Sequence, residues 1–380
     1  LEAYLADKDN VVREFFTRSA ENFALATTGD FRMPGMWGSD VFSPLTRGNN
    51  FVTALHKLDH DREQLEYLIE KRRLPQQFEQ LAKEYGAVRE TIAAAMSKDH
   101  NPTKVLGSIR GRYYAIGSSH FEILRGTYNS LLHAPRDPAE GLGGTRSMGS
   151  RAALNPDLDW EAIEKEYISK ELPLVWFDGF LSQDALEGVL EYCREATVFF
   201  DVKVGYLGAY LNDGLSSPWL VQIAQELQQR LPRVLEGMTI SNIWAYKFDS
   251  DTSLNGITVH ADVASVNLNF WVTPDDANLD PSFGGLVVYP KEPPHGAGAT
   301  EDSTGGSKFD AEKWNNFAQE SFIKSWLKDE GVYDLAVTVP YRQNRVVMFD
   351  SRLLHETDTF RFRGGYENRR INLTFLFSRA

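Results

Sequence analysis

Two different hydrophobic periodicities divide the chain. Between residues 52 and 74, leucines recur at spacings of three, seven and three residues, which places them on one face of a helix. Pro75 then starts a second stripe of helical spacing that continues to Val88. The members of the two stripes are Leu55, Leu58, Leu65 and Leu68, followed by Phe78, Leu81, Tyr85 and Val88. We therefore expect the first part of the chain to be helical.

In the second part of the chain, helices give way to strands. Helical patterns cover residues 160–169, 183–195 and 218–231, and from residue 240 onward apolar positions recur with a period of two. The segments with this alternation are 240–248, 265–272, 285–290, 345–350 and 370–378. Strands at this density, separated by turns, favour a β-sandwich or barrel over a parallel sheet with alternating helices.

A change of composition separates the two parts. Residues 135–159 are rich in Gly, Pro, Ser and Asp and show no periodicity, which is typical of a linker. We expect a helical domain at 1–140, a linker at 141–158 and a second domain at 159–380. The helical domain would bind a substrate or partner, or mediate homodimerisation. A Gly-, Pro- and Ser-rich stretch at 291–310 is predicted to be a lid or a disordered loop, followed by a helix at 311–328.

Composition narrows the classes of partner. The 380-residue chain has a net charge of −13, which disfavours binding to nucleic acids and to anionic membranes. Its one cysteine, Cys193, excludes a disulfide framework and a cysteine-rich zinc site. No run of 18 apolar residues is present, and the first residues show no signal-peptide pattern. We expect a soluble, cytoplasmic protein.

One set of residues has the composition of a metal site. His260 and Asp262 lie two residues apart at a predicted strand end, so both side chains point to one side. His355 follows the predicted strand at 345–350. Two imidazoles and one carboxylate form a facial triad that leaves coordination positions open, as non-haem Fe(II) oxygenases require. A closed structural zinc site needs four ligands, and the sequence offers no obvious fourth.

A charged residue on the last predicted strand indicates an anionic ligand beside the metal site. Arg370, Asn372 and Thr374 share one face of that strand. An inward-facing arginine beside a metal is costly unless an anion pairs with it, which a metal-chelating dicarboxylate would do. Tyr246, 14 residues before His260, would donate a hydrogen bond to the same carboxylate. Arg369 is then expected to face solvent or substrate.

These segments resemble the 2-oxoglutarate/Fe(II)-dependent oxygenases, most closely their prolyl-4-hydroxylase-like branch. The resemblance covers roughly residues 170–380 and rests on WAYKFD, VHAD, FGGLVVYP, NRVVMFDSRLLHET and NRRINLTFLFS. It implies an α+β protein in which a helical N-terminal region precedes a double-stranded β-helix, a jelly-roll or cupin-like domain with flanking helices. His260, Asp262 and His355 would hold Fe(II). Arg370 would bind the distal carboxylate of 2-oxoglutarate, with Tyr246, Asn372 and Thr374 beside it.

The resemblance also implies an activity. The protein would use 2-oxoglutarate and O₂ to hydroxylate an unactivated C–H bond, with release of succinate and CO₂. The substrate would be peptide-like, amino-acid-like or another polar small molecule. Two alternatives remain open at this point: a binding module without turnover, and a cupin-like metalloenzyme that does not use 2-oxoglutarate.

A second pair of histidines has helical spacing. His56 and His60 lie four residues apart on the first predicted helix, beside Asp59 and Asp61. This geometry is compatible with metal binding, but a charged helix face is the expected interpretation.

Overall fold

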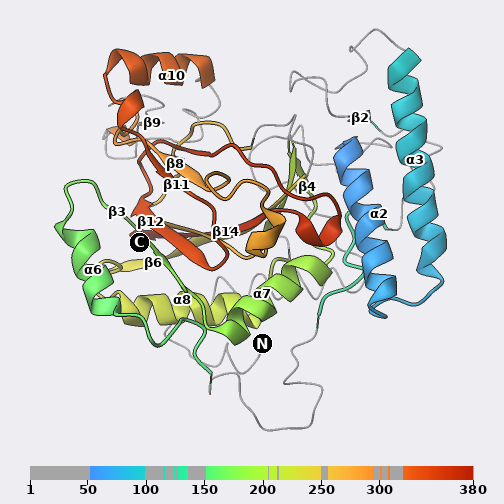
Figure 1. The fold of residues 1–380 in the computed structure, drawn as a ribbon, viewed down its shortest axis with the longest axis horizontal. Coiled ribbons are helices and arrows are strands. Elements are labelled where there is room, and N and C mark those ends of the chain that lie inside the picture. The colour runs from blue at the N-terminus through green and yellow to red at the C-terminus, as the bar shows by residue number, and fades with distance from the viewer. Residues whose placement is uncertain are drawn as a thin grey trace.

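The computed structural model of the chain combines helices with antiparallel sheets (Figure 1). It describes residues 52–98, 114–115, 124, 127–135, 151–203, 205–211, 214–249, 256–294, 300–301, 307–308 and 320–379. Most of the predicted lid at 291–310 and the first 51 residues lie outside these ranges.

A seven-stranded antiparallel sheet forms the centre of the structure. Its strand order is β3-β12-β7-β14-β6-β5-β4. The strands are β3 (Leu174–Asp178), β4 (Asp201–Lys203), β5 (Tyr206–Tyr210), β6 (Met238–Phe248), β7 (Val266–Trp271), β12 (Arg345–Asp350) and β14 (Ile371–Arg379). The last strand, β14, lies between β6 and β7 and pairs with both. Four of the five predicted strands therefore belong to this sheet.

A smaller sheet packs on one face of the large one. It consists of β8 (Leu286–Val288), β11 (Val337–Val339) and β13 (His355–Thr357), in the order β11-β8-β13. Val288 and Val339 of this sheet share an apolar cluster with Trp271 and Phe349 of the large sheet. Two short pairs lie apart from both sheets: β1 (Val52–Thr53) with β2 (Tyr114–Ala115), and β9 (Thr300–Glu301) with β10 (Ser307–Lys308).

Helices cover the opposite face of the large sheet. These are α6 (Trp160–Ser169), α7 (Gln183–Glu195) and α8 (Pro218–Arg230), as predicted within one residue. The side chains of Asp159 and Ser182 cap α6 and α7 by accepting a backbone hydrogen bond, and Pro218 occupies the first turn of α8. Helix α10 (Glu320–Asp329) matches the described part of the helix expected at 311–328.

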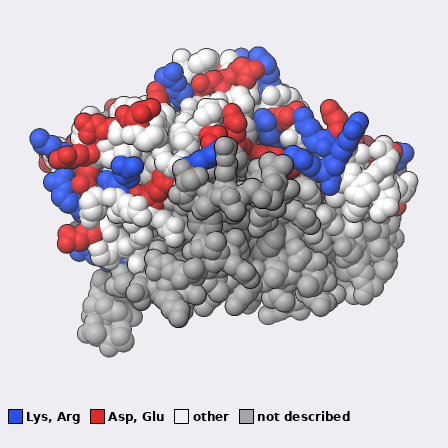
Figure 2. Space-filling model, turned by 90° about the horizontal axis from the view of Figure 1, so that it is seen from below, with Lys and Arg blue, Asp and Glu red and all other residues white. Residues whose placement is uncertain are grey.

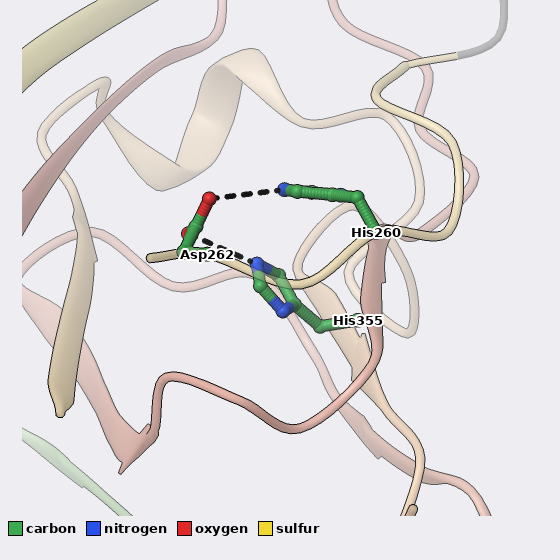
Figure 3. Close-up of side chains that lie close together, drawn as sticks. All are labelled: His260, Asp262 and His355. Atoms are coloured by element: carbon green, nitrogen blue, oxygen red, sulfur yellow. Dashed lines mark ion pairs between the residues drawn. The ribbon is translucent and has the colours of Figure 1, made fainter. Parts of the chain in front are cut away.

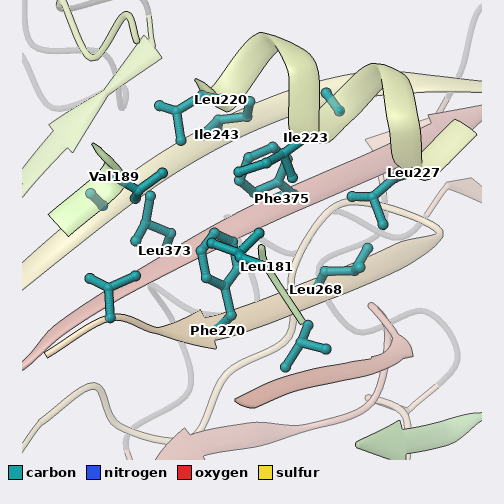
Figure 4. Close-up of a cluster of buried hydrophobic side chains, with 14 of the residues drawn as sticks. Leu181, Val189, Leu220, Ile223, Leu227, Ile243, Leu268, Phe270, Leu373 and Phe375 are labelled. Carbon is teal, nitrogen blue, oxygen red and sulfur yellow. The ribbon is translucent and has the colours of Figure 1, made fainter. Parts of the chain in front are cut away.

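The alternation of β14 separates the two faces of the sheet. Leu373 and Phe375 lie in the main apolar core, beneath Leu220, Ile223 and Leu227 of α8 (Figure 4). Ile371 and Phe377 belong to the same core. The side chains of Arg370, Asn372 and Thr374 lie on the opposite face, toward the small sheet. Because side chains of a strand alternate between faces, burying the apolar set against α8 fixes the polar set on the side of the predicted metal site.

The first two helices form a pair that contacts the rest of the protein through the first of them. Helices α2 (Leu55–Glu70) and α3 (Phe78–Lys98) form an antiparallel pair with a small apolar core of its own. The Gln64 side chain of α2 donates hydrogen bonds to the carbonyls of Arg194 and Ala196, at 3.2 and 3.1 Å. The predicted linker at 141–158 is described only from residue 151, where Ala153 and Leu154 are buried.

Short 3₁₀ segments, η5 (Asp275–Ala277), η6 (Tyr333–Leu335) and η7 (Tyr366–Asn368), occupy some of the connections. In the part of the chain that the structure describes, no helix has the length and apolar character that crossing a bilayer requires. Basic and acidic side chains are interspersed on the described surface drawn in Figure 2.

Candidate metal centre

The backbones of His260 and His355 pair directly. Each residue donates its N–H to the carbonyl of the other, at 2.9 and 2.8 Å, in an isolated antiparallel bridge. His355 is the first residue of β13, so this bridge places His260 beside β13 at the edge of the small sheet. Asp262 is held nearby because its N–H donates to the carbonyl of Ser351 at 3.1 Å. Residues far apart in the sequence are thus brought together by backbone hydrogen bonds.

The three side chains converge on one point (Figure 3). Their ligand atoms all lie within 4.8 Å of one another, and no other such cluster occurs among the described residues. Nε2 of His260 is 3.8 Å from Oδ1 of Asp262, and Nε2 of His355 is 3.4 Å from Oδ2. The Nδ1 atoms lie 2.8 and 2.9 Å from the carbonyl oxygens of Thr258 and Leu353. Nδ1 therefore carries the proton in each ring, which leaves Nε2 as the ligand atom.

The protonation states suit metal binding. Burial, and then the neighbouring His355, lowers the pKa of His260 to about 4. Burial alone would raise the pKa of Asp262, but its two histidine neighbours and the hydrogen bond from the Asn267 amide lower it overall. At neutral pH the site therefore offers a neutral His260 and an ionised Asp262, the forms that bind metals.

Arg370 is buried beside the glycine pair that precedes β8. Its Nε donates to the Gly284 carbonyl at 2.8 Å and its Nη2 to the Gly285 carbonyl at 3.1 Å. Its Nη1 donates to Oδ1 of Asn372 at 3.1 Å, and its guanidinium lies 4.6 Å from the Phe248 ring centroid. Burial lowers its pKa to about 10.

All these hydrogen-bond partners of Arg370 are neutral. No carboxylate of the described residues lies within 4.0 Å of its nitrogens, although the side chain is only 2% exposed. Asp358 acts on the guanidinium electrostatically but forms no ion pair with it, and a buried cation without a contacting anion is costly. The arrangement therefore provides a strong binding position for an anion on the same side of the sheet as Asn372.

The two glycines are required for this contact. Gly284 has φ +93°, a conformation that other residues rarely adopt. A Cβ on Gly285 would lie 1.9 Å from the carbonyl oxygen of Val339 on the paired strand β11. The close approach of the chain at this point places both glycine carbonyls where Arg370 reaches them.

The other expected cosubstrate contacts lie on the same face. Asn372 is directly opposite Tyr246 on β6, and Thr374 is opposite Trp244. The Tyr246 ring packs against Tyr206, and its hydroxyl is 3.3 Å from that of Tyr210. Burial raises the pKa of Tyr246. The Thr374 hydroxyl donates to Oδ1 of Asn269 at 2.7 Å.

The expectation for Arg369 is wrong. Its side chain is 5% exposed and forms ion pairs with Asp249, at 2.8 Å, and with Glu63 of α2, at 2.9 Å. Lys247 of β6 is also buried against α2, where its Nζ contacts Nε2 of His60 at 3.2 Å. Residues that flank Tyr246 and Arg370 in the sequence thus face the helical pair, where the sequence indicated no partner.

The histidines of α2 do not form a second metal site. His60 is buried with Nδ1 3.0 Å from Asp61 and Nε2 3.2 Å from Nζ of Lys247, so both ring nitrogens are occupied. Burial is the main cause that lowers the pKa of both His56 and His60. Their environment is the interface between α2 and the sheet.

Sequence reasoning did not identify Asn267 and Asn269. Both are buried in β7, a strand without a single exposed residue, and the Asn267 amide donates to Oδ2 of Asp262 at 2.7 Å. The signal was two amides at a spacing of two within an apolar strand. Buried amides are costly unless each is hydrogen-bonded, so such a pair indicates a polar partner on that face.

No protein-family model matches the chain, and no curated protein matches it significantly. Solved structures do. The chain is similar in structure to 2-oxoglutarate/Fe(II) oxygenases, including a prolyl-4-hydroxylase. That Pseudomonas putida prolyl-4-hydroxylase is 15% identical, with 58% of this chain and 99% of the other covered and a TM-score of 0.34.

Two further similar structures are those of SnoN and HygX. The non-haem α-ketoglutarate-dependent epimerase SnoN from nogalamycin biosynthesis is 12% identical over 58% of this chain and 83% of its own, with a TM-score of 0.37. HygX from Streptomyces hygroscopicus, with nickel, 2-oxoglutarate and hygromycin B bound, is 12% identical over 60% and 87%, with a TM-score of 0.36. Because these scores and identities are low, we infer the function of this chain from its own residues.

Proposed function

We propose that this protein is a 2-oxoglutarate- and Fe(II)-dependent dioxygenase that hydroxylates an unactivated C–H bond. The observation that carries the proposal is the combination of a His260–Asp262–His355 triad with a buried Arg370 that forms no ion pair among the described residues. We also propose that the two facing antiparallel sheets are those of a double-stranded β-helix, with the metal ligands at one end of the small sheet.

The residues of the triad fit Fe(II). Two imidazoles and one carboxylate occupy three positions and leave three for exogenous ligands. A closed zinc site is disfavoured because no fourth His, Cys, Asp or Glu joins this group among the described residues. Iron bound here would supply the oxidising chemistry, with O₂ and 2-oxoglutarate as cosubstrates.

The residues around Arg370 fit the cosubstrate. We propose that the guanidinium binds the distal carboxylate of 2-oxoglutarate, since a planar fork of donors matches a carboxylate. Asn372 would hold Arg370 in orientation through its 3.1 Å hydrogen bond. Tyr246, opposite Asn372, would offer its hydroxyl to the same carboxylate, and Thr374 would line the site further along β14.

The chain itself contributes orientation and the exclusion of water. The carbonyls of Thr258 and Leu353 keep Nδ1 protonated, so that Nε2 stays available. Phe248 and Phe360 pack on Arg370, at 4.6 and 5.4 Å, and shield its charge from solvent. A carboxylate at Asp262 occupies the position that a halide would need, which favours hydroxylation as the outcome.

For the substrate, we propose a peptide-like, amino-acid-like or other polar small molecule. We further propose that the segment at 291–310 contributes to substrate selection. The substrate class rests on the family resemblance, and the role of the segment rests on its Gly-, Pro- and Ser-rich composition.

The proposal is tested first without oxygen. Fe(II) and then 2-oxoglutarate are added to the purified protein, and the weak visible charge-transfer band of the chelate is recorded. Oxygen is then admitted and succinate is assayed. We expect the band and slow uncoupled succinate formation in the wild type and neither in His260→Ala. Val263→Ala is the matched control, because Val263 is 50% exposed beside Asp262 and offers no ligand.

Other outcomes separate the alternatives. Iron binding without a charge-transfer band would contradict the use of 2-oxoglutarate and favour a cupin-like metalloenzyme. Absence of iron binding in the wild type would overturn the enzyme assignment and leave a binding module.

A further inference from the structure

Three buried polar side chains connect Asp262 to the centre of the large sheet. The Asn267 amide nitrogen donates to Oδ2 of Asp262 at 2.7 Å. The Asn269 amide nitrogen donates to Oδ1 of Asn267 at 2.6 Å. The Thr374 hydroxyl donates to Oδ1 of Asn269 at 2.7 Å, across the β7–β14 pairing that places these two residues opposite each other. The result is one continuous chain of hydrogen bonds.

The direction of this chain is fixed by chemistry. An ionised carboxylate accepts hydrogen bonds and does not donate them, so Asn267 must present its NH₂ group to Asp262. Its carbonyl oxygen is then left to accept from Asn269, whose own carbonyl accepts from the Thr374 hydroxyl. Every donor therefore points toward Asp262, an arrangement in which each bond polarises the next.

The three side chains are buried, so losing any one of these hydrogen bonds is costly. The exposed fractions of Asn267, Asn269 and Thr374 are 0%, 7% and 2%. Their side chains lie in a sheet whose other face is apolar, so loss of one member leaves its neighbour unpaired inside the protein. A buried network of this kind holds its members in one geometry only while every member is present.

We propose that Asn267, Asn269 and Thr374 are positioning residues that orient Asp262 for metal binding. Asn267 occupies Oδ2, which leaves Oδ1, on the side of His260, as the metal-binding oxygen. The relay also joins the metal ligand to β14, the strand after Arg370, so that the two halves of the site share one rigid network. This inference rests on the proposed metal site.

Metal affinity tests the relay directly. Co(II) is titrated anaerobically into the protein, and its visible d–d absorption reports both the dissociation constant and the ligand geometry. Asn267→Leu removes the donor at similar volume, and we expect roughly 10- to 100-fold weaker binding together with an altered spectrum. Thr374→Val removes only the distal hydroxyl and should weaken binding by roughly 3- to 10-fold. Thr374→Ser retains the hydroxyl and should restore wild-type affinity.

A control separates orientation from general destabilisation. Leu268 lies between the two asparagines but points into the apolar core on the other face. Leu268→Ala should lower the melting temperature and leave Co(II) affinity and spectrum unchanged. If Asn267→Leu does not fold, the Val and Ser variants of Thr374 still decide the question.

Three results would overturn the inference in distinguishable ways. Wild-type affinity and spectrum in both Asn267→Leu and Thr374→Val would exclude the relay and leave the metal site intact. Equal losses of affinity in Leu268→Ala and Asn267→Leu would show destabilisation alone. Failure of the wild type to bind Co(II) would remove the proposed metal site, and the relay with it.

Discussion

Arg369 and Arg370 are neighbours in the sequence, but their guanidinium groups have entirely different partners. Arg369 is neutralised by Asp249 and by Glu63 of α2. Among the described residues, the hydrogen-bond acceptors of Arg370 are the carbonyls of Gly284 and Gly285 and the amide oxygen of Asn372. One arginine therefore fastens the helical pair to the sheet, while the other retains its capacity for an anion.

The first prediction concerns this capacity. Arg370→Leu should raise the KM for 2-oxoglutarate by about 30-fold or more, because a buried charge-assisted carboxylate contact is lost. Arg370→Lys should recover only part of it, because an ammonium lacks the planar fork. Fe(II) affinity measured without 2-oxoglutarate should remain at the wild-type level.

The adjacent arginine supplies the control. Arg369→Gln should reduce the free energy of unfolding and leave the KM for 2-oxoglutarate nearly unchanged. An equal increase of KM in both variants would contradict the division of roles between the two residues.

The glycine pair gives a second prediction. Gly285→Ala places a methyl group against the Val339 carbonyl and displaces one acceptor of Arg370. We expect a loss of about 1–3 kcal/mol in unfolding free energy, measured by urea denaturation. Gly364→Ala is the matched control, since a Cβ there meets nothing within 4 Å, and it should be nearly neutral.

A third prediction measures the attachment of α2. Glu63 and Arg369 are separated by 306 residues and joined by a 2.9 Å ion pair. In a double-mutant cycle with Glu63→Gln and Arg369→Gln, we expect a coupling energy of about 1–3 kcal/mol in chemical denaturation. Strictly additive effects would show that this ion pair does not stabilise the interface.

A fourth prediction concerns pH. The folded state lowers the pKa of His260 from 6.5 to about 4, so the unfolded chain binds more protons between these values. Stability from this residue is fully present above pH 6.5 and is lost as the pH falls toward 4. His56 and His60, whose pKa values are also lowered, act in the same direction. The raised pKa of Asp61 opposes the trend at the acidic end.

The measurement is the melting temperature of the metal-free protein from pH 7 down to pH 4. We expect a steady decrease across the window, and a smaller slope in His260→Asn. A melting temperature that rises on acidification from pH 7 would show that these imidazoles are not buried in their neutral form. Co(II) added at pH 7 should raise the melting temperature, since it binds only the folded state.

The longer segments with a clear pattern were predictable from sequence, and most of the short strands were not. The limits of α6, α7 and β12 match the predicted ranges, because the two helices have a full helical pattern and β12 is an apolar run bounded by Arg345 and Asp350. β4, β11 and β13 have three residues each, too few to show a period. Their existence depends on pairing partners supplied by the fold.

Prediction of the site from sequence is limited in the same way by contacts that form only in the folded protein. The spacing of His260, Asp262 and His355 was sufficient to predict a cluster, and the structure brings the three together. The partner of Arg369 was not predictable, because Glu63 reaches it only after α2 packs on the sheet. The alternation of the last strand was enough to select Arg370 over Arg369, whereas tertiary contacts decide what Arg369 faces.

The burial of Lys247 and Arg369 beneath α2 predicts which residues related proteins carry at these two positions. Lys247 contacts His60 and Arg369 contacts Glu63, so neither buried basic side chain is suited to a sheet that lacks α2. Relatives that retain the sheet without the helices should carry uncharged residues at these two positions. Glu63 and Arg369 should change together among relatives that retain both parts.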